Sequence, residues 1–85
     1  MPEYEIRITK TALKDINQLS SKLKAKLKDI LVNVVADNPY EGKELLGDLE
    51  GNYSLRLTHK DRIVYSINEE KKIVYIKRTK THYCD

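Results

Sequence analysis

A histidine and a tyrosine near the C-terminus are the residues best suited to chemistry. His82 and Tyr83 follow the apolar run Ile73–Ile76, with basic residues in between. Histidine has an unperturbed pKa that lets its side chain donate and accept protons near neutral pH. The apolar run is typical of a strand at the centre of a sheet. The sequence therefore predicts that a core strand ends close to a polar site.

Two arginines are expected to lie side by side. The segments Asn52–Thr58 and Asp61–Ile67 alternate between apolar and polar residues, which predicts two strands with Arg56 and Arg62 on the polar side. A two-residue turn at His59–Lys60 would mix the two faces. A three-residue loop instead pairs the leucines of the first strand with an isoleucine and a tyrosine of the second strand. It also places Arg56 directly across from Arg62 or on its diagonal.

Such a pair has a chemical consequence. Like charges on neighbouring strands cost up to about 1 kcal/mol, so the two arginines indicate a site for an anion. The alternative is two guanidinium groups that point separately into water. Acidic residues that could complete a site lie in the segment before these strands: Glu41, Glu44, Asp48 and Glu50.

The chemistry that these groups allow is cleavage of a phosphodiester. With the 2′-OH of RNA as the internal nucleophile, the reaction needs a base, an acid and positive charge at the phosphate oxygens. It requires no metal and no other cofactor. The sequence has no glycine-rich phosphate loop, zinc-ligand spacing or serine nucleophile elbow.

The remaining pattern predicts an α+β fold in one domain, residues 1–85. Alternation over Glu3–Ile8 predicts an N-terminal strand, and Thr9 and Ser20 are expected to cap two helices in a hairpin. Pro39 and Gly42 end the second helix. The rest is expected to form a three-stranded antiparallel meander, giving a small sheet with both helices on one face.

Composition limits the class of protein. A net charge of +3 is consistent with an anionic partner such as nucleic acid. The lysines of the second predicted helix either bind phosphate or form a solvated surface. The single cysteine excludes an internal disulfide and fits a reducing compartment. No apolar stretch approaches the ~20 residues that span a bilayer. We therefore expect a cytoplasmic protein with no membrane contact.

Four motifs together resemble the bacterial RelE/ParE toxin superfamily, and most closely its YoeB/Txe branch: Pro39–Lys43, Gly51–Leu57, Asp61–Tyr65 and the terminal His82–Tyr83. The resemblance covers nearly the whole chain and includes the order of strand, two helices and strands. Asp61 departs from the branch, which has a histidine directly before the arginine.

The resemblance implies a RelE-like fold and the toxin of a type II toxin–antitoxin system. Its implied activity is ribosome-dependent, metal-independent endonucleolytic cleavage of mRNA. The implied partners are a cognate antitoxin, the ribosome and mRNA, with a homodimer or a toxin–antitoxin hetero-oligomer as the assembled form. Two alternatives stay open: a ParE-like inhibitor of DNA gyrase that is not a nuclease, and an RNA-binding module without chemistry.

The resemblance also implies roles for individual residues. Arg62 would stabilise the phosphate in the transition state, and Arg56 would support it. His82 would be a general acid or base, and Tyr83 would stack on a nucleotide.

The resemblance also implies which acidic residue supplies a carboxylate for catalysis. Glu44 is the implied catalytic carboxylate, with Glu41 and Glu50 as alternatives, and which of Glu44 and His82 acts as base stays open. No residue is expected to bind a metal. The predicted RNA-binding residues are Arg56, Lys43, Arg78 and Lys80.

Overall fold

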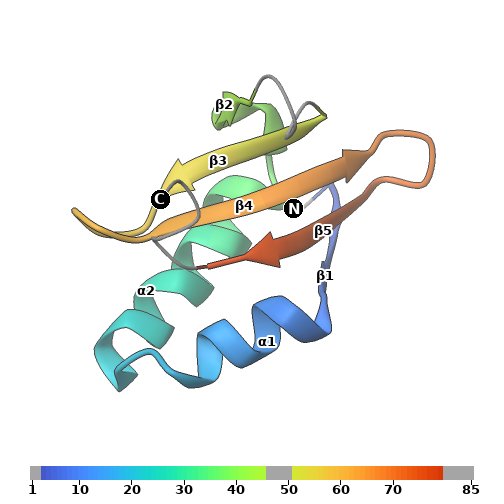
Figure 1. Ribbon diagram of the computed structural model, residues 1–85. Helices are drawn as coiled ribbons and strands as arrows, with labels where there is room; N and C mark the ends of the chain where they lie inside the picture. Colours follow the sequence, from blue (N-terminus) through green and yellow to red (C-terminus); the bar gives the residue numbers. More distant parts are fainter. Residues whose placement is uncertain (1–2, 46–50, 80–85) are drawn as a thin grey trace.

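Within residues 3–45 and 51–79, which the computed structural model describes, the chain forms a five-stranded mixed sheet with two helices. Figure 1 shows the helices on one side of the sheet. The strands lie in the order β1-β5-β4-β3-β2, with β1 parallel to β5 and the other neighbours antiparallel. The elements are β1 (Glu5–Ile8), α1 (Lys10–Asn17), α2 (Ser21–Ile30), the π-helical turn η1 (Leu31–Val35), the 3-10 turn η2 (Pro39–Glu41), β2 (Lys43–Glu44), β3 (Asn52–Arg56), β4 (Arg62–Asn68) and β5 (Ile73–Arg78).

The expected α+β class is confirmed, with the N-terminal strand, the helical hairpin and the antiparallel meander in the predicted order. Both predicted helix caps are present. Thr9 Oγ1 accepts a hydrogen bond from the Ala12 N–H at 3.2 Å, and Ser20 Oγ accepts one from the Leu23 N–H at 3.3 Å. The sequence does not predict β2, because two residues are too few to show an alternation.

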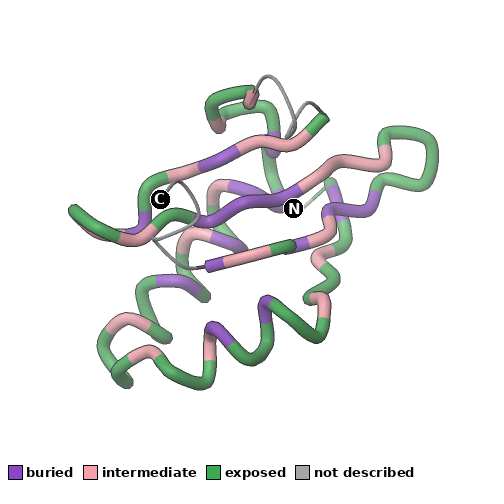
Figure 2. Tube along the Cα trace, in the orientation of Figure 1, coloured by how far each residue is buried: buried purple, intermediate pink, exposed green. Residues whose placement is uncertain are grey.

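The core lies between the helices and one face of the sheet. Figure 2 shows buried positions along the middle strands and on the inner sides of the helices. Because α1 and α2 contribute to the same cluster as β4 and β5, they cover the same face. The fully or nearly buried apolar residues of this cluster include Ala12, Leu27, Leu31, Val35, Leu57, Ile63, Tyr65, Val74 and Ile76.

Tyr65 fixes the segment that joins the helices to the sheet. Its buried hydroxyl donates a hydrogen bond to the Pro39 carbonyl at 2.6 Å, and its ring stacks on Tyr53 with 5.9 Å between centroids. A Cβ atom at Gly42 would lie 2.3 Å from the Tyr65 hydroxyl and 2.9 Å from the Ser54 carbonyl. Gly42 has a φ of −73°, so glycine is required here for close approach rather than for an unusual turn.

We predict that Gly42→Ala lowers the free energy of unfolding by about 1–3 kcal/mol, because the added methyl group overpacks the contact with Tyr65. Urea denaturation measures the change. The cost should be smaller in a Tyr65→Phe background, which removes the nearest atom. Gly51→Ala is the control, since Gly51 has a φ of 92° and open space, and its cost should not depend on Tyr65. An equal cost of Gly42→Ala in both backgrounds would contradict this reading.

A polar cluster connects the β4–β5 turn to the N-terminal segment and to η2. Glu69 Oε1 accepts hydrogen bonds from the hydroxyls of Tyr4 and Tyr40, each at 2.7 Å. Glu69 Oε2 forms an ion pair with Lys72, whose Nζ lies 5.0 Å from the centre of the Tyr4 ring. The hydrogen bonds from Lys72, Tyr40 and Tyr4 lower the pKa of Glu69 to about 2.

This shift predicts a pH dependence of stability. Because the pKa of Glu69 falls from its ordinary 4.5 on folding, the carboxylate stabilises the fold above that pH, and the contribution disappears as the pH falls toward 2. We predict that Glu69→Gln lowers the thermal midpoint at pH 7 and that its difference from the wild type shrinks at acidic pH. Glu70→Gln, an exposed acid in the same turn, is the control; equal midpoints of the two variants at pH 7 would refute the prediction.

Candidate functional site

Arg56 and Arg62 lie directly opposite each other on β3 and β4. The Leu57 N–H donates a hydrogen bond to the Asp61 carbonyl at 2.8 Å, which leaves residues 58–60 as the three-residue loop that the sequence predicts. The expected Leu-to-Ile pairing is confirmed between Leu55 and Ile63. The expected Leu-to-Tyr pairing is wrong, because Tyr65 pairs with Tyr53.

Thr58 holds the loop between the arginine-bearing strands in one conformation. Its hydroxyl donates to Asp61 Oδ2 at 3.0 Å and accepts from the N–H groups of Lys60 and Asp61 at 3.1 and 2.8 Å. These bonds form a short turn in which a side chain replaces a backbone acceptor. The loop therefore fixes the register that brings the arginines together.

The arginines are on the side of the sheet away from the helices. Along β3, Arg56 shares a face with Ser54, whereas Tyr53 and Leu55 point to the core. Arg56 and Arg62 are exposed, and no acid of the described residues forms an ion pair with either. Two positive charges therefore lie side by side, and no acid within residues 3–45 and 51–79 neutralises them.

Lys43 belongs to this side of the sheet and Glu44 does not. In the β2–β3 pairing, Lys43 stands opposite Ser54 and Glu44 stands opposite Tyr53. Because paired residues share a face, Lys43 lies on the arginine side and Glu44 on the helix side. Among the other acids, Glu41 is an exposed residue of η2. Asp48 and Glu50 are outside the described residues.

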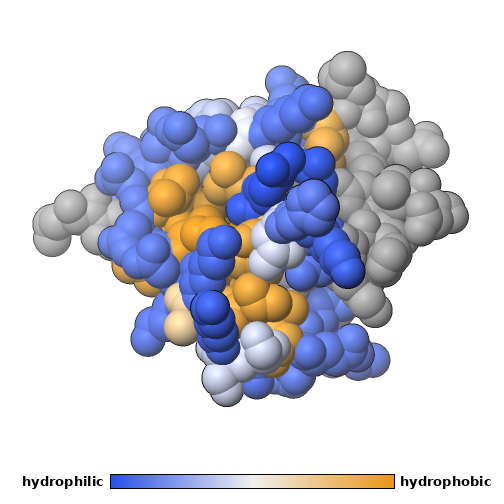
Figure 3. Space-filling model, turned by 90° about the vertical axis from the view of Figure 1, so that its left-hand side faces the viewer, coloured by the Kyte–Doolittle hydropathy of each residue, from blue (hydrophilic) through white to orange (hydrophobic). Residues whose placement is uncertain are grey.

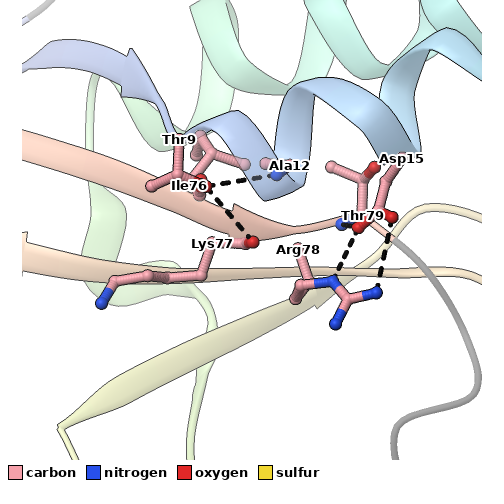
Figure 4. A network of polar contacts seen from close by, with 7 residues as sticks. All are labelled: Thr9, Ala12, Asp15, Ile76, Lys77, Arg78 and Thr79. Carbon is pink, nitrogen blue, oxygen red and sulfur yellow. Dashed lines mark hydrogen bonds and ion pairs between the residues drawn. The ribbon is translucent and has the colours of Figure 1, made fainter.

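Lys77 is a further basic residue on the arginine side of the sheet, and it was not among the residues predicted from the sequence. It follows the buried Ile76 on β5, and Figure 4 shows its side chain pointing away from α1. We call the side of the sheet away from the helices the arginine face, defined by Lys43, Arg56, Arg62 and Lys77.

Arg78 is bound to an acid of α1. Its Nε lies 2.8 Å from Asp15 Oδ2 and its Nη2 lies 3.4 Å from Asp15 Oδ1, as Figure 4 shows. The hydrogen bond to Asp15 raises the pKa of Arg78. The Arg78 side chain is still 42% exposed, whereas the Asp15 side chain is 6% exposed.

The remaining predicted site residues, Lys80, His82 and Tyr83, lie outside the described residues. The described chain ends at Thr79, one residue after Arg78, which pairs with Val64 of β4. Arg62 is two residues from Val64, about 7 Å along the strand. Because β5 runs antiparallel to β4, β5 ends near the end of β4 at which Arg62 lies.

Apolar surface is found elsewhere on the molecule. A groove of about 310 Å³ runs between β1 and the helices, and Lys24 and Lys28 border it. Figure 3 shows that apolar side chains also gather, among hydrophilic ones, on the face at the left of Figure 1. The apolar residues that line the groove are Ile6, Ile8, Ile16, Leu27, Leu31 and Val32.

Two kinds of site have no support in the part of the chain that the structure describes. No helix there is long and apolar enough to cross a membrane. No three histidine, cysteine, aspartate or glutamate side chains there are grouped so that they could hold a metal ion.

Comparison with known proteins tests the resemblance that the sequence motifs indicated. Residues 6–83 match the model of a family described as the ParE-like toxin of type II bacterial toxin–antitoxin systems. Toxin RelE of Mycobacterium tuberculosis is 33% identical over 84 residues, which cover 94% of this chain and 86% of the relative. The chain belongs to the ParE-like toxin family.

Solved structures agree with this assignment. The M. tuberculosis toxin–antitoxin complex RelBE2 contains a chain with a TM-score of 0.85 and 29% identity, covering 96% of this chain and 100% of that one. The YoeB dimer of Staphylococcus aureus gives a TM-score of 0.77 and 25% identity, covering 95% of this chain and 99% of that one. Both RelE and YoeB toxins are therefore similar to this chain in fold.

The arginine face predicts a measurable affinity for anions. Replacing the two arginines by alanine removes a like-charge contact, so Arg56→Ala/Arg62→Ala should change stability by at most about 1 kcal/mol, in the stabilising direction at low salt. A short RNA oligonucleotide should raise the thermal midpoint of the wild type and raise that of this variant less. Lys22→Ala/Lys26→Ala, with the same change in charge on α2, is the control. Equal responses of the two double variants would contradict an anion site at the arginines.

Proposed function

We propose that this toxin is a ribosome-dependent endoribonuclease that cleaves mRNA through attack of a 2′-OH on the adjacent phosphodiester. The observation that carries the proposal is the direct opposition of Arg56 and Arg62 near the end of β5, with no ion pair to an acid of the described residues. Cleavage builds negative charge on the phosphate, and donors fixed before the reaction stabilise that charge most effectively. The family assignment supports the role of a toxin in a type II toxin–antitoxin system.

The proposed mechanism divides the work between the sheet and the C-terminal residues. Arg62 and Arg56 bind the phosphate oxygens, and His82 transfers protons as general acid or base. Tyr83 stacks on a nucleotide beside the cleaved bond. Lys43 and Lys80 would bind the RNA backbone. Arg78 would also bind it, through the guanidinium N–H groups that do not contact Asp15.

The identity of the base is part of the proposal. We favour His82 over Glu44, because Glu44 stands opposite Tyr53 on the helix side of the sheet, whereas the arginines are on the other side. A base must come within hydrogen-bond reach of the proton that it removes. Glu41 and Glu50 remain alternatives for a supporting carboxylate.

Dependence on the ribosome follows from the small size of the site. A few cations on one face of a small sheet do not fix a flexible RNA strand in the geometry for in-line attack. The ribosome would hold the message, and the toxin would supply charge and proton transfer. This proposal places the protein in the cytoplasm and predicts little cleavage of free RNA.

A cognate antitoxin is the proposed regulatory partner. A similar toxin has been solved as a toxin–antitoxin complex and another as a dimer, so we propose that this chain also forms a hetero-oligomer, a homodimer, or both. An acidic segment that folds on the arginine face would neutralise the exposed charges and exclude RNA. The antitoxin would thereby block the same surface that binds the message.

The alternative is a ParE-like inhibitor of DNA gyrase without nuclease activity, which the name of the matching family keeps open. Binding to a protein surface does not require two unneutralised arginines in direct opposition, so the arginine face favours the nuclease. The two functions differ in their products. A nuclease creates new 5′ ends in messages, whereas a gyrase inhibitor damages DNA and leaves messages intact.

We predict that Arg62→Ala and His82→Ala each relieve growth arrest and reduce mRNA cleavage by about 100-fold or more, because each removes a group acting in the transition state. Primer extension after induction measures the new 5′ ends, and circular dichroism checks that the variants fold. Lys22→Ala is the control and should remain toxic. DNA damage with unchanged message ends in the wild type would establish the gyrase alternative and refute the nuclease.

A further inference from the structure

Tyr75 is an aromatic residue on the arginine face. It lies on β5 between Val74 and Ile76, which are both fully buried in the core cluster. Because successive residues of a strand point to opposite faces, the Tyr75 side chain points away from the helices. The residue is partly exposed. The ring therefore belongs to the same surface as the paired arginines.

Tyr75 differs from the other described tyrosines in its contacts. The structure describes five of the six tyrosines, all but Tyr83. The side chain of Tyr75 forms no hydrogen bond and no ring contact with any residue of the ranges 3–45 and 51–79. Four tyrosines form at least one such contact within the fold: Tyr4, Tyr40, Tyr53 and Tyr65. Within those ranges, the fold accounts for four of the rings and not for that of Tyr75.

The residues beside Tyr75 on the next two strands are polar and uncharged. Tyr75 pairs with Ser66 of β4, and Ser66 pairs with Asn52 of β3. Paired residues share a face, so the three side chains form a row across the sheet. Serine and asparagine both donate and accept hydrogen bonds, as the edges of bases and the ribose hydroxyls do. The row therefore combines an aromatic ring with groups that can bind a nucleoside.

A lysine lies between this row and the arginine pair. Lys77 follows Tyr75 by two residues, about 7 Å along β5, and its side chain points away from α1 (Figure 4). Because β5 runs antiparallel to β4, this step leads from the level of Ser66 toward that of Arg62. The arginine face thus presents, in order, the paired arginines, a lysine and an aromatic ring.

The neighbouring strand β1 limits this path on its other side. Arg7 pairs with Tyr75, but its Nε donates a hydrogen bond to Glu5 Oε2 at 2.6 Å. Arg7 and Glu5 are two residues apart on β1, so both lie on the same face as Tyr75. A carboxylate at this position repels phosphate. The path for an anionic strand therefore runs from the arginines to Tyr75 and not beyond it.

The length of the path fits a few nucleotides of single-stranded RNA. Arg62 is four residues from Ser66, about 13 Å along β4, and Tyr75 is one strand further across, about 5 Å. The Tyr75 backbone is therefore about 14 Å from that of Arg62. A stacked strand advances about 3.4 Å per nucleotide, so this distance corresponds to about four stacked nucleotides, or to fewer extended ones.

We propose that Tyr75 stacks on a base of the message within about four nucleotides of the phosphate bound by Arg62, and that Lys77 binds the backbone between them. Aromatic side chains on an open sheet surface bind the splayed bases of single-stranded RNA in this way. The inference rests on the proposed function. It adds a second base contact to the one proposed for Tyr83.

The test measures the affinity of the full-length toxin for an eight-nucleotide RNA with 2′-O-methyl groups throughout, which removes the attacking 2′-OH and keeps the strand intact. Fluorescence anisotropy gives the dissociation constant. We expect Tyr75→Ala to weaken binding about 5- to 100-fold, because it removes one stacked base. Tyr75→Phe keeps the ring and should bind within twofold of the wild type. Leu13→Ala, which shortens an exposed apolar side chain of α1, is the matched control and should also bind like the wild type.

Two further readouts separate stacking from other effects. An abasic oligonucleotide with the same number of phosphates should bind Tyr75→Ala and the wild type equally, because it has no base to stack. Tyr75→Ala should leave the salt dependence of RNA binding unchanged, whereas Lys77→Ala should reduce the slope of log K against log salt by about 0.7. Wild-type affinity of Tyr75→Ala for the RNA, or an equal loss for the abasic strand, would overturn the proposal.

The remaining outcomes distinguish the proposal from the function on which it rests. Should Tyr75→Ala fail to fold by circular dichroism, Tyr75→Leu replaces it, since leucine keeps apolar bulk without a ring; affinity equal to that of Tyr75→Phe would overturn the proposal. If Arg56→Ala/Arg62→Ala binds the RNA as tightly as the wild type, the anion site and the proposed function are wrong. If that double variant loses affinity and Tyr75→Ala does not, only the stacking role of Tyr75 is wrong.

Discussion

The pairing of β3 with β4 forces two guanidinium groups together, and the site depends on this pairing. Neighbouring strands lie about 5 Å apart, so Arg56 and Arg62 oppose each other with no described acid between them. The contacts on the other face maintain the arrangement, because a slip of β3 by one residue would move Leu55 away from the core face. Apolar burial therefore keeps the two like charges side by side, and we propose that a phosphate group binds there.

The distribution of charge is consistent with this picture. The net charge of +3 is small for a protein that is expected to bind nucleic acid. Several acids form ion pairs within the protein: Asp15 pairs with Arg78, Glu69 with Lys72, and Glu5 with Arg7. Among the described residues, no ion pair neutralises the cations of the arginine face. A modest overall charge thus produces a local concentration of positive charge.

The predictable parts of the structure were those set by local sequence. Thr9 and Ser20 cap their helices because a side-chain oxygen satisfies an N–H a few residues away, and the β3–β4 loop follows from matching two alternating patterns. The Asp15–Arg78 pair joins residues 63 positions apart, and no periodicity reports it. The sequence indicated Gly42 as a residue that ends the second helix, but the reason for glycine is the Tyr65 hydroxyl, which comes from a distant strand. The side on which Glu44 lies depends on β2, a strand too short to recognise, while His82 and Tyr83 stay predictions from the sequence.

The most direct test of the account is whether one phosphate is contacted by both arginines and by His82. Nuclear magnetic resonance can follow the Arg56 and Arg62 side-chain N–H signals and the His82 imidazole signals while a 3′-nucleoside monophosphate is added. The account predicts that all three sets shift with the same dissociation constant, and that Arg62→Ala abolishes the shift of His82. Shifts of the arginine signals while His82 stays unchanged would contradict it.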